Sequence, residues 1–465
     1  MLTLTRVRPV AETSSAVLAF AGAIVTARMD AGLAGAWVLV GLGSAIPLYV
    51  LARGWRLAWW LTAVAAALPL GVVLTALVHG YGEGAARAAR YAWVAILFLA
   101  IVAWARTPSR RLAAAGGVLV LVADIYLTGW WIWWGGDDPS RRMYGNFYMP
   151  NQFGIVMAVG MLVAAAIVVL GRRLLVVAAV LVACLAGAGL IASASRASIA
   201  LGAAAFVVIV LFGVVARRWW GLVRGVLLAA AILGAAMFMA SSVFFPVAAA
   251  EGVGFGSGLA DRSSASSSWG ARVVYWIYGL RMGVEAPLAG VGLQGFGPHL
   301  ECMITERYSS NPHNEFVLAW AETGLLGAVP FAAVLVGVGV LVIRSFRRDP
   351  DAPVARRVRW FPSAAELLAD PVRWGALVAT FIAVGHLAFD FDGCYPALLA
   401  VVGLVAGLAA APVLRMRWTP LREVATWVGP ALALVLVVMG VLGFVIDPIP
   451  GDPLMPHHVT VGCPA

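Results

Sequence analysis

A histidine stands at the start of an apolar stretch, directly after the longest polar segment of the chain. His313 lies in the run Asn-Pro-His-Asn, and Asn314 follows it. An unperturbed imidazole titrates near neutral pH, so it can remove a proton from a hydroxyl group. We therefore predict that His313 is a catalytic base and that Asn314 contacts the substrate beside it. The competing interpretation is an interfacial histidine that caps the start of a helix.

Two arginines could bind an anionic substrate at the same surface. Arg196 lies in the polar turn 193–198 between two apolar stretches, and Arg272 lies between two tryptophans in a polar segment. A guanidinium stays charged, and its paired N–H groups match the oxygens of a phosphate. We predict that both arginines are catalytic, because they could neutralise a leaving phosphate. For Arg196, an ordinary hairpin tip between two spans is the alternative.

Three more residues are predicted to bind substrate. Arg281 follows Arg272 by nine residues and lies on the opposite face of the same predicted helix. Of these two arginines, Arg272 is the one we expect to face the site. Arg142 and Asn151 flank the start of another apolar stretch. Phosphate or sugar contacts there compete equally with interfacial and helix-capping roles.

A carboxylic acid, Glu322, lies inside the apolar stretch that begins at His313. On one helix, their nine-residue separation is about 180° around the axis and roughly 13 Å along it. The two side chains therefore cannot form a pair on that helix. A carboxylate inside a span is costly unless it is paired or protonated. We predict that Glu322 gives structural support by facing another helix, and that Gly324 lets this neighbour approach closely.

The elements that must position these residues are membrane spans. The 465 residues are 62% hydrophobic and only 12% charged. Because a bilayer takes roughly 20 apolar residues per helix, we predict an all-α polytopic membrane protein with about 12–14 transmembrane helices. These form a single transmembrane domain over residues 1–465. The predicted spans are 14–28, 32–51, 57–78, 90–105, 112–129, 151–170, 173–191, 198–215, 222–242, 314–343, 373–389, 395–414 and 430–446.

The basic residues indicate topology rather than nucleic-acid binding. All 32 are arginines, and 22 of the 32 fall in alternate short loops, which the positive-inside rule places in the cytoplasm. The N-terminus is therefore predicted to be cytoplasmic. The long loop 243–312, with a helix at 269–284, is predicted to be periplasmic, and the basic loop 344–372 cytoplasmic. The predicted span at 430–446 places the tail 447–465 outside.

The sequence predicts neither a metal site nor a cofactor. It contains no CxxC, HExxH or histidine-cluster motif, which are the usual ligand patterns. Cys302, Cys394 and Cys463 fall on the predicted periplasmic side, where one disulfide is possible. The sequence does not choose the pair.

The order of these motifs resembles the O-antigen ligase/polymerase family of bacterial envelope glycosyltransferases. His313-Asn314, after a long outer loop, is followed by Glu322-x-Gly324. The similarity covers about residues 140–330. Three further segments in this range are similar to the family: Gly145–Asn151, Ser195-Arg196, and Arg272-x-x-x-Trp276 followed by Pro287-Leu288-x-Gly290-Val291-Gly292.

The resemblance implies an inverting, metal-independent transfer of a glycan from undecaprenyl diphosphate at the periplasmic face of the inner membrane. His313 matches the essential histidine of the family, and Arg196 and Arg272 match the arginines that hold the diphosphate. In ligases of lipopolysaccharide biosynthesis the acceptor is lipid A–core, and in polymerases it is another lipid-linked glycan. We predict a ligase, with a polymerase as the alternative. The expected partners are these substrates and membrane lipids, with no nucleic acid.

A transporter for a lipid-linked glycan or an anion is the alternative from another class. No internal repeat is visible at a fixed period, although many secondary transporters are built from such repeats. Polar ionisable residues are also scarce in the middle of the predicted spans. Asp124, His386, Asp390 and Asp392 all lie toward the outer ends of their spans. Both features favour a transferase.

Overall fold

The computed structural model describes the larger part of the chain. The predicted spans 14–28, 32–51 and 430–446 and the tail 447–465 lie outside the described residues. The described ranges are 59–79, 104–135, 142–147, 149–171, 175–239, 267–304, 309–345, 362–390 and 396–412, with positions 91, 94, 97, 98, 101 and 102.

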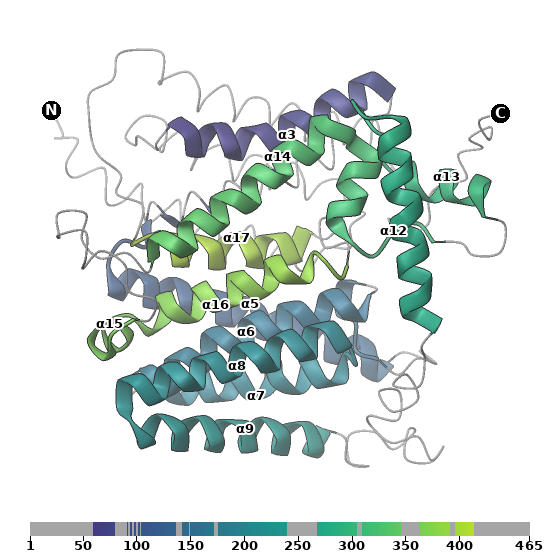
Figure 1. Cartoon of the computed structure of the whole chain (residues 1–465). Helices are drawn as coiled ribbons and strands as arrows, with labels where there is room; N and C mark the ends of the chain where they lie inside the picture. The colour runs from purple at the N-terminus through teal and green to yellow at the C-terminus, as the bar shows by residue number, and fades with distance from the viewer. Residues whose placement is uncertain are drawn as a thin grey trace, which may run out of the picture.

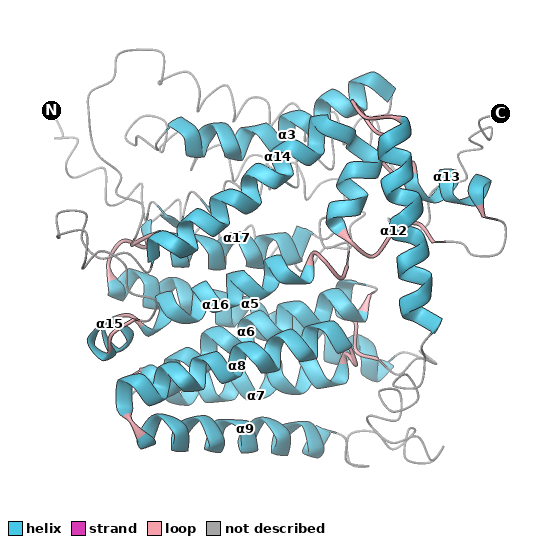
Figure 2. Ribbon diagram, viewed as in Figure 1, coloured by secondary structure: helices cyan, strands magenta, loops and turns pink. Residues whose placement is uncertain are grey.

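All regular elements among the described residues are helices (Figure 2). Six of them are long and apolar enough to cross a membrane within this part of the chain. The chain is therefore an all-α polytopic membrane protein, as its composition predicted. The helices are α3 Trp59–His79, α5 Pro108–Gly135, α6 Pro150–Leu170, α7 Leu175–Ala192, α8 Arg196–Arg217, α9 Trp219–Met239, α12 Ser267–Glu285, α13 Phe296–Met303, α14 Glu315–Ser345, α15 Ala364–Ala369, α16 Pro371–His386 and α17 Pro396–Ala410, with a 3-10 turn at Gly145–Phe147.

Helix α6 forms the centre of the bundle, with α7, α8 and α16 packed around it (Figure 1). Its residues are apolar all round and almost all are buried, as expected of a helix with no polar face. The aromatic pair Phe212 and Trp374 joins α8 to α16, with ring centroids 5.9 Å apart. The peripheral helix α9 instead exposes apolar residues such as Val226 and Leu227, which suits contact with lipid.

Helix α14 lies where the span 314–343 was predicted, and it is broken at Gly324. Gly324 has φ 51° and ψ −145°. The segment 315–323 runs beside α12, whereas 325–345 runs beside α3 (Figure 1). Glu322 therefore lies in the segment before the break, not in the segment packed on α3.

The break at Gly324 is imposed by a neighbouring turn of backbone. A Cβ at Gly324 would lie 2.6 Å from the carbonyl oxygen of Pro287. The N–H groups of Leu325 and Leu326 donate to the carbonyls of Pro287 and Leu288, at 2.8 and 3.1 Å. These bonds satisfy donors that a continuous helix would have satisfied internally, which a backbone inside a membrane protein requires.

The predicted helix at 269–284 is present as α12, which crosses one end of the bundle (Figure 1). It packs on the first segment of α14, where a Cβ at Gly279 would lie 2.5 Å from Val317. The short helix α13 follows in the same predicted loop and was not foreseen. In α13, Cys302 is disulfide-bonded, whereas Cys184 of α7 is free.

Candidate active site

Polar residues from five elements meet at the end of the bundle that α12 crosses (Figure 1). They come from α12, the N-terminal ends of α6 and α8, the turn 309–314 before α14, and the turn 387–390 after α16. Segments far apart in the sequence are thus brought to one place.

His313 pairs with Asp390. The imidazole Nδ1 lies 3.1 Å from Oδ1 of Asp390, with the His313 side chain 28% exposed and that of Asp390 2% exposed. The histidine is therefore accessible to a substrate, and the carboxylate behind it is not.

Two adjoining turns fix this pair. His313 has φ 51°, an uncommon conformation for a residue other than glycine, and its N–H donates to Oδ1 of Asn311 at 3.1 Å. Asn314 Oδ1 accepts from the N–H groups of Phe316 and Val317, and thereby caps the start of α14. Its Nδ2 donates to the carbonyl of Ala388 at 3.1 Å. Asn314 therefore ties the histidine turn to the aspartate turn.

The second oxygen of Asp390 is also engaged. Asn151 Nδ2 donates to Oδ2 of Asp390 at 2.5 Å. Arg142 Nη2 donates to Oδ1 of Asn151 at 3.0 Å, and Arg142 Nε donates to the carbonyl of Ser193 at 2.7 Å. The two residues predicted to contact substrate, Arg142 and Asn151, are therefore part of a chain of hydrogen bonds behind His313.

Asp390 is ionised at neutral pH. Burial raises the pKa of its carboxyl group, but the hydrogen bond and charge of His313, the charge of His386 and the hydrogen bond from Asn151 together lower that pKa to about 2. An ionised carboxylate only accepts hydrogen bonds, so Nδ1 of His313 carries the proton in their contact. In a neutral imidazole, Nε2 then holds the lone pair that can accept a proton.

Arg272 and Arg196 add positive charge beside this pair. Arg272 Nη1 donates to the carbonyl of Phe389 at 3.0 Å, next to Asp390. Burial lowers the pKa of Arg272, the Asp390 carboxylate raises it, and the charge of Arg196 lowers it again. Both groups are therefore close enough to Arg272 to act on its charge. The exposed Arg196 is the first residue of α8.

The turn that carries Arg196 is anchored to the neighbouring helices. Ser195 caps α8 by accepting from the N–H of Ser198. Ser198 Oγ lies 3.1 Å from Nε2 of the fully buried His386 and donates to the carbonyl of Asn151 at 3.2 Å. These contacts hold the arginine turn in register with the residues around Asp390.

Sequence reasoning did not select Asp390, His386 or Ser198 as site residues. The available signal was the position of His386 and Asp390 at the end of an apolar stretch, where ionisable residues are unusual. Their partners lie in other elements, so sequence position alone did not link them to His313.

The remaining predicted residues lie elsewhere. Arg281 is exposed on α12 and pairs with Glu285 at 2.7 Å. Glu322 is buried, and its backbone carbonyl accepts from the N–H of Gly292 at 3.1 Å. Within the described ranges, no group of three or more His, Cys, Asp or Glu side chains has a geometry that could hold a metal ion.

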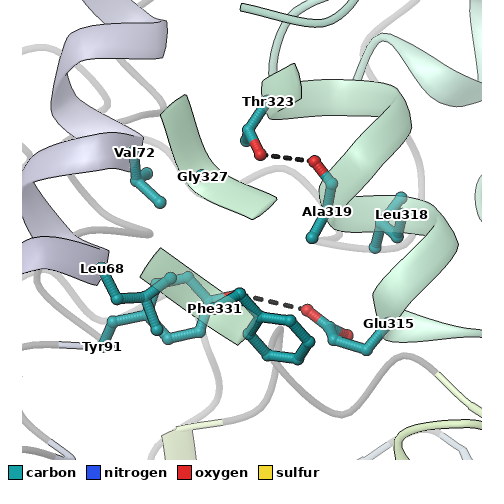
Figure 3. Close-up of a pocket in the computed structure, with 9 residues that line it drawn as sticks. All are labelled: Leu68, Val72, Tyr91, Glu315, Leu318, Ala319, Thr323, Gly327 and Phe331. Atoms are coloured by element: carbon teal, nitrogen blue, oxygen red, sulfur yellow. Dashed lines mark hydrogen bonds between the residues drawn. The ribbon is translucent and has the colours of Figure 1, made fainter. Parts of the chain in front are cut away.

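A small pocket lies in the inner angle of the broken α14, opposite α3 (Figure 3). Its acidic residue is Glu315, which is 3% exposed and accepts a hydrogen bond from the Tyr91 hydroxyl at 3.1 Å. The break at Gly324 thus also shapes a cavity, and the lining residue Glu315 follows His313 by two positions in the sequence. The lining residues are Leu68, Val72, Tyr91, Glu315, Leu318, Ala319, Thr323, Gly327 and Phe331.

Fold and site together define a polytopic membrane protein with an oriented imidazole and two arginines at one end of its helices. Residues 181–332 match the family model described as O-antigen ligase. The match confirms the resemblance of the sequence to the O-antigen ligase family over these residues. The matched range contains Arg196, Arg272 and His313, but neither Asn151 nor Asp390. No curated protein matches the chain.

Proposed function

We propose that this protein is an O-antigen ligase-type glycosyltransferase. It moves a glycan from undecaprenyl diphosphate to lipid A–core at the periplasmic face of the bacterial inner membrane. The observation that carries the proposal is the His313–Asp390 pair beside Arg272 and Arg196. This arrangement supplies a proton acceptor for a hydroxyl group and positive charge for a diphosphate.

His313 acts as the general base. Asp390 accepts the hydrogen bond from Nδ1–H and stabilises the imidazolium that forms. Nε2 takes the proton of the acceptor hydroxyl as its oxygen bonds to the anomeric carbon of the glycan. The bond between that carbon and the diphosphate oxygen breaks, and its electron pair leaves with the diphosphate. Attack from the face opposite the leaving group inverts the anomeric centre.

Arg196 and Arg272 hold the leaving diphosphate. Negative charge on the departing oxygens grows in the transition state, and fixed guanidinium groups stabilise it there without reorganising. Two arginines whose charges repel each other are stabilised most when a polyvalent anion binds between them. The lowering of the Arg272 pKa by Arg196 is therefore consistent with a site prepared for such an anion.

The disulfide of Cys302 supports the periplasmic placement. Disulfides persist in oxidising compartments such as the bacterial periplasm. Cys302 lies in α13, which packs against α12 and α14, the helices that flank the site. The predicted topology, with the loop 243–312 outside, places the same helices in the periplasm.

The acceptor decides between a ligase and a polymerase of the same family. Purified protein is given an undecaprenyl-diphosphate-linked glycan together with either lipid A–core or a second lipid-linked glycan. Transfer to lipid A–core is the expected result. Elongation of the lipid-linked glycan alone would assign a polymerase, and transfer to neither acceptor would contradict glycan transfer.

The role of His313 is tested in the same assay. His313→Ala is expected to lower the transfer rate by roughly 10²–10⁴-fold, the usual contribution of a positioned base. His299→Ala is the matched control, because His299 bonds the carbonyl of Gly295 within the turn that begins α13. A similar rate in both variants, at equal amounts of folded protein, would overturn the mechanism.

A further inference from the structure

Helix α12 exposes a stripe of apolar side chains. Successive members are three or four residues apart, so they line one face of the helix. Each of the five is at least 40% exposed. We call this face the α12 stripe; it consists of Trp269, Val273, Ile277, Leu280 and Val284.

The orientation of the stripe is fixed by the opposite face of α12. Met282 is fully buried and Tyr275 is 8% exposed. Trp276 Nε1 donates to the carbonyl of Pro312 at 2.9 Å, and Arg272 donates to Phe389. The carbonyl of Leu280 accepts from Trp320 at 3.1 Å. The helix is thus docked on the bundle along its length, and the stripe is the face that remains outward.

The stripe has a charged edge. Arg281 and Glu285 form an exposed ion pair on the side of α12 away from Arg272. By helical geometry, the stripe lies between this pair and the flank that carries Arg272. A helix with an apolar face, a charged edge and tryptophan at its end is typical of segments that lie in the plane of a membrane surface.

The stripe continues into the apolar surface of a membrane span. Leu288 is 63% exposed, and its carbonyl accepts from the N–H of Leu326. Next to this contact, Leu325 is 48% exposed, and one turn later Val329 is 57% exposed on the segment of α14 that packs with α3. The outer face of a spanning helix contacts lipid, so an adjoining apolar stripe fits the same environment.

We propose that α12 lies in the plane of the bilayer surface, with the α12 stripe inserted into the hydrocarbon of the adjacent leaflet. Figure 1 shows α12 running across the ends of the bundle helices, as an in-plane helix must. The continuity through Leu288 favours lipid as the occupant over a protein partner.

This placement fixes the depth of Arg272. Its side chain leaves α12 beside the stripe, on the flank that meets Phe389. A helix whose apolar face is in hydrocarbon holds its flanking cations at the level of the lipid headgroups. On the proposed function, this is the depth at which the diphosphate of a lipid-linked donor lies. The membrane placement itself does not depend on that function.

Spin labels on single introduced cysteines test the proposal. Ile277→Cys and Val284→Cys place labels on the stripe, and Arg281→Cys places one on the charged edge of the same helix. Full-length protein is reconstituted in phosphatidylethanolamine and phosphatidylglycerol vesicles, and the unaltered protein gives the labelling background. Oxygen, which partitions into hydrocarbon, and a water-soluble nickel complex serve as relaxing agents.

We expect the ratio of oxygen to nickel collision rates to be several-fold higher at 277 and 284 than at 281. Equal ratios at all three positions would overturn the proposal, because the stripe would then face water. Protection of 277 and 284 from both agents would also overturn it, because a protein surface would then cover the stripe. The measurement needs no turnover, so an inactive protein with a lipid-exposed stripe would contradict only the proposed function.

Discussion

Nδ1 of His313 and Oδ1 of Asp390 lie 3.1 Å apart, although the two residues are separated by 77 positions in the chain. The aspartate is held from behind by Asn151 and the histidine by the turn that begins at Asn311. A partly exposed imidazole is thus oriented by a buried carboxylate. Such an arrangement lets one ring nitrogen serve a substrate while the other is fixed.

Asp390→Asn should lower the turnover number of glycan transfer by roughly 10²–10⁴-fold, with a smaller effect on KM. The amide keeps the shape of the side chain but removes the charge that stabilises the imidazolium. The rate is measured with purified protein and both acceptors. Asp124→Asn, which changes a carboxylate of α5, is the control. A turnover close to that of the unaltered protein would mean that His313 works without Asp390.

Acid should destabilise the protein through Asp390. Its pKa in the folded protein is about 2, below the ordinary value of about 3.9 for an unfolded chain. A carboxyl group whose pKa is lowered by folding stabilises the folded protein at pH values above the pKa of the unfolded chain. This stabilisation is lost as pH falls from about 4 to about 2. The unfolding temperature of the detergent-solubilised protein should therefore fall more over this pH range than that of the Asp390→Asn variant. Identical pH dependence would contradict the ionised, hydrogen-bonded state.

Arg196→Lys and Arg272→Lys should each reduce transfer by about 10- to 100-fold, the equivalent of one charge-assisted hydrogen bond. Lysine keeps the charge but loses the planar fork that binds two phosphate oxygens. Arg344→Lys, at the exposed far end of α14, is the control in the same assay. Near-normal rates in both site variants would indicate that positive charge alone is sufficient, or that neither arginine meets the diphosphate.

Gly324→Ala should destabilise the protein by about 1–3 kcal/mol, because an L side chain is strained at φ 51° and its Cβ would meet Pro287. Gly337→Ala is the matched control in the same helix, since a Cβ there meets nothing within 4 Å. The control should leave the unfolding temperature unchanged or raise it slightly. Equal unfolding temperatures in the two variants would show that the break at Gly324 is not required.

The spans were predictable because hydropathy is a local property. The predicted span 151–170 corresponds to α6, Pro150–Leu170. The next predicted span, 173–191, corresponds to α7, Leu175–Ala192. A run of apolar residues satisfies its backbone only as a helix in hydrocarbon, whatever its neighbours are. The break at Gly324 was not predictable, because it depends on carbonyl groups contributed by Pro287 and Leu288.

The sequence by itself singled out His313, Arg196 and Arg272 as candidates, because polar residues next to apolar runs are visible in any local window. Only the tertiary structure decided that Asp390 lies behind His313 and that Arg142 and Asn151 serve this aspartate. It also decided that Arg281 lies away from the site, paired with Glu285. The physical reason is that a hydrogen bond acts over about 3 Å of space, and helix packing, not sequence separation, determines which side chains come that close.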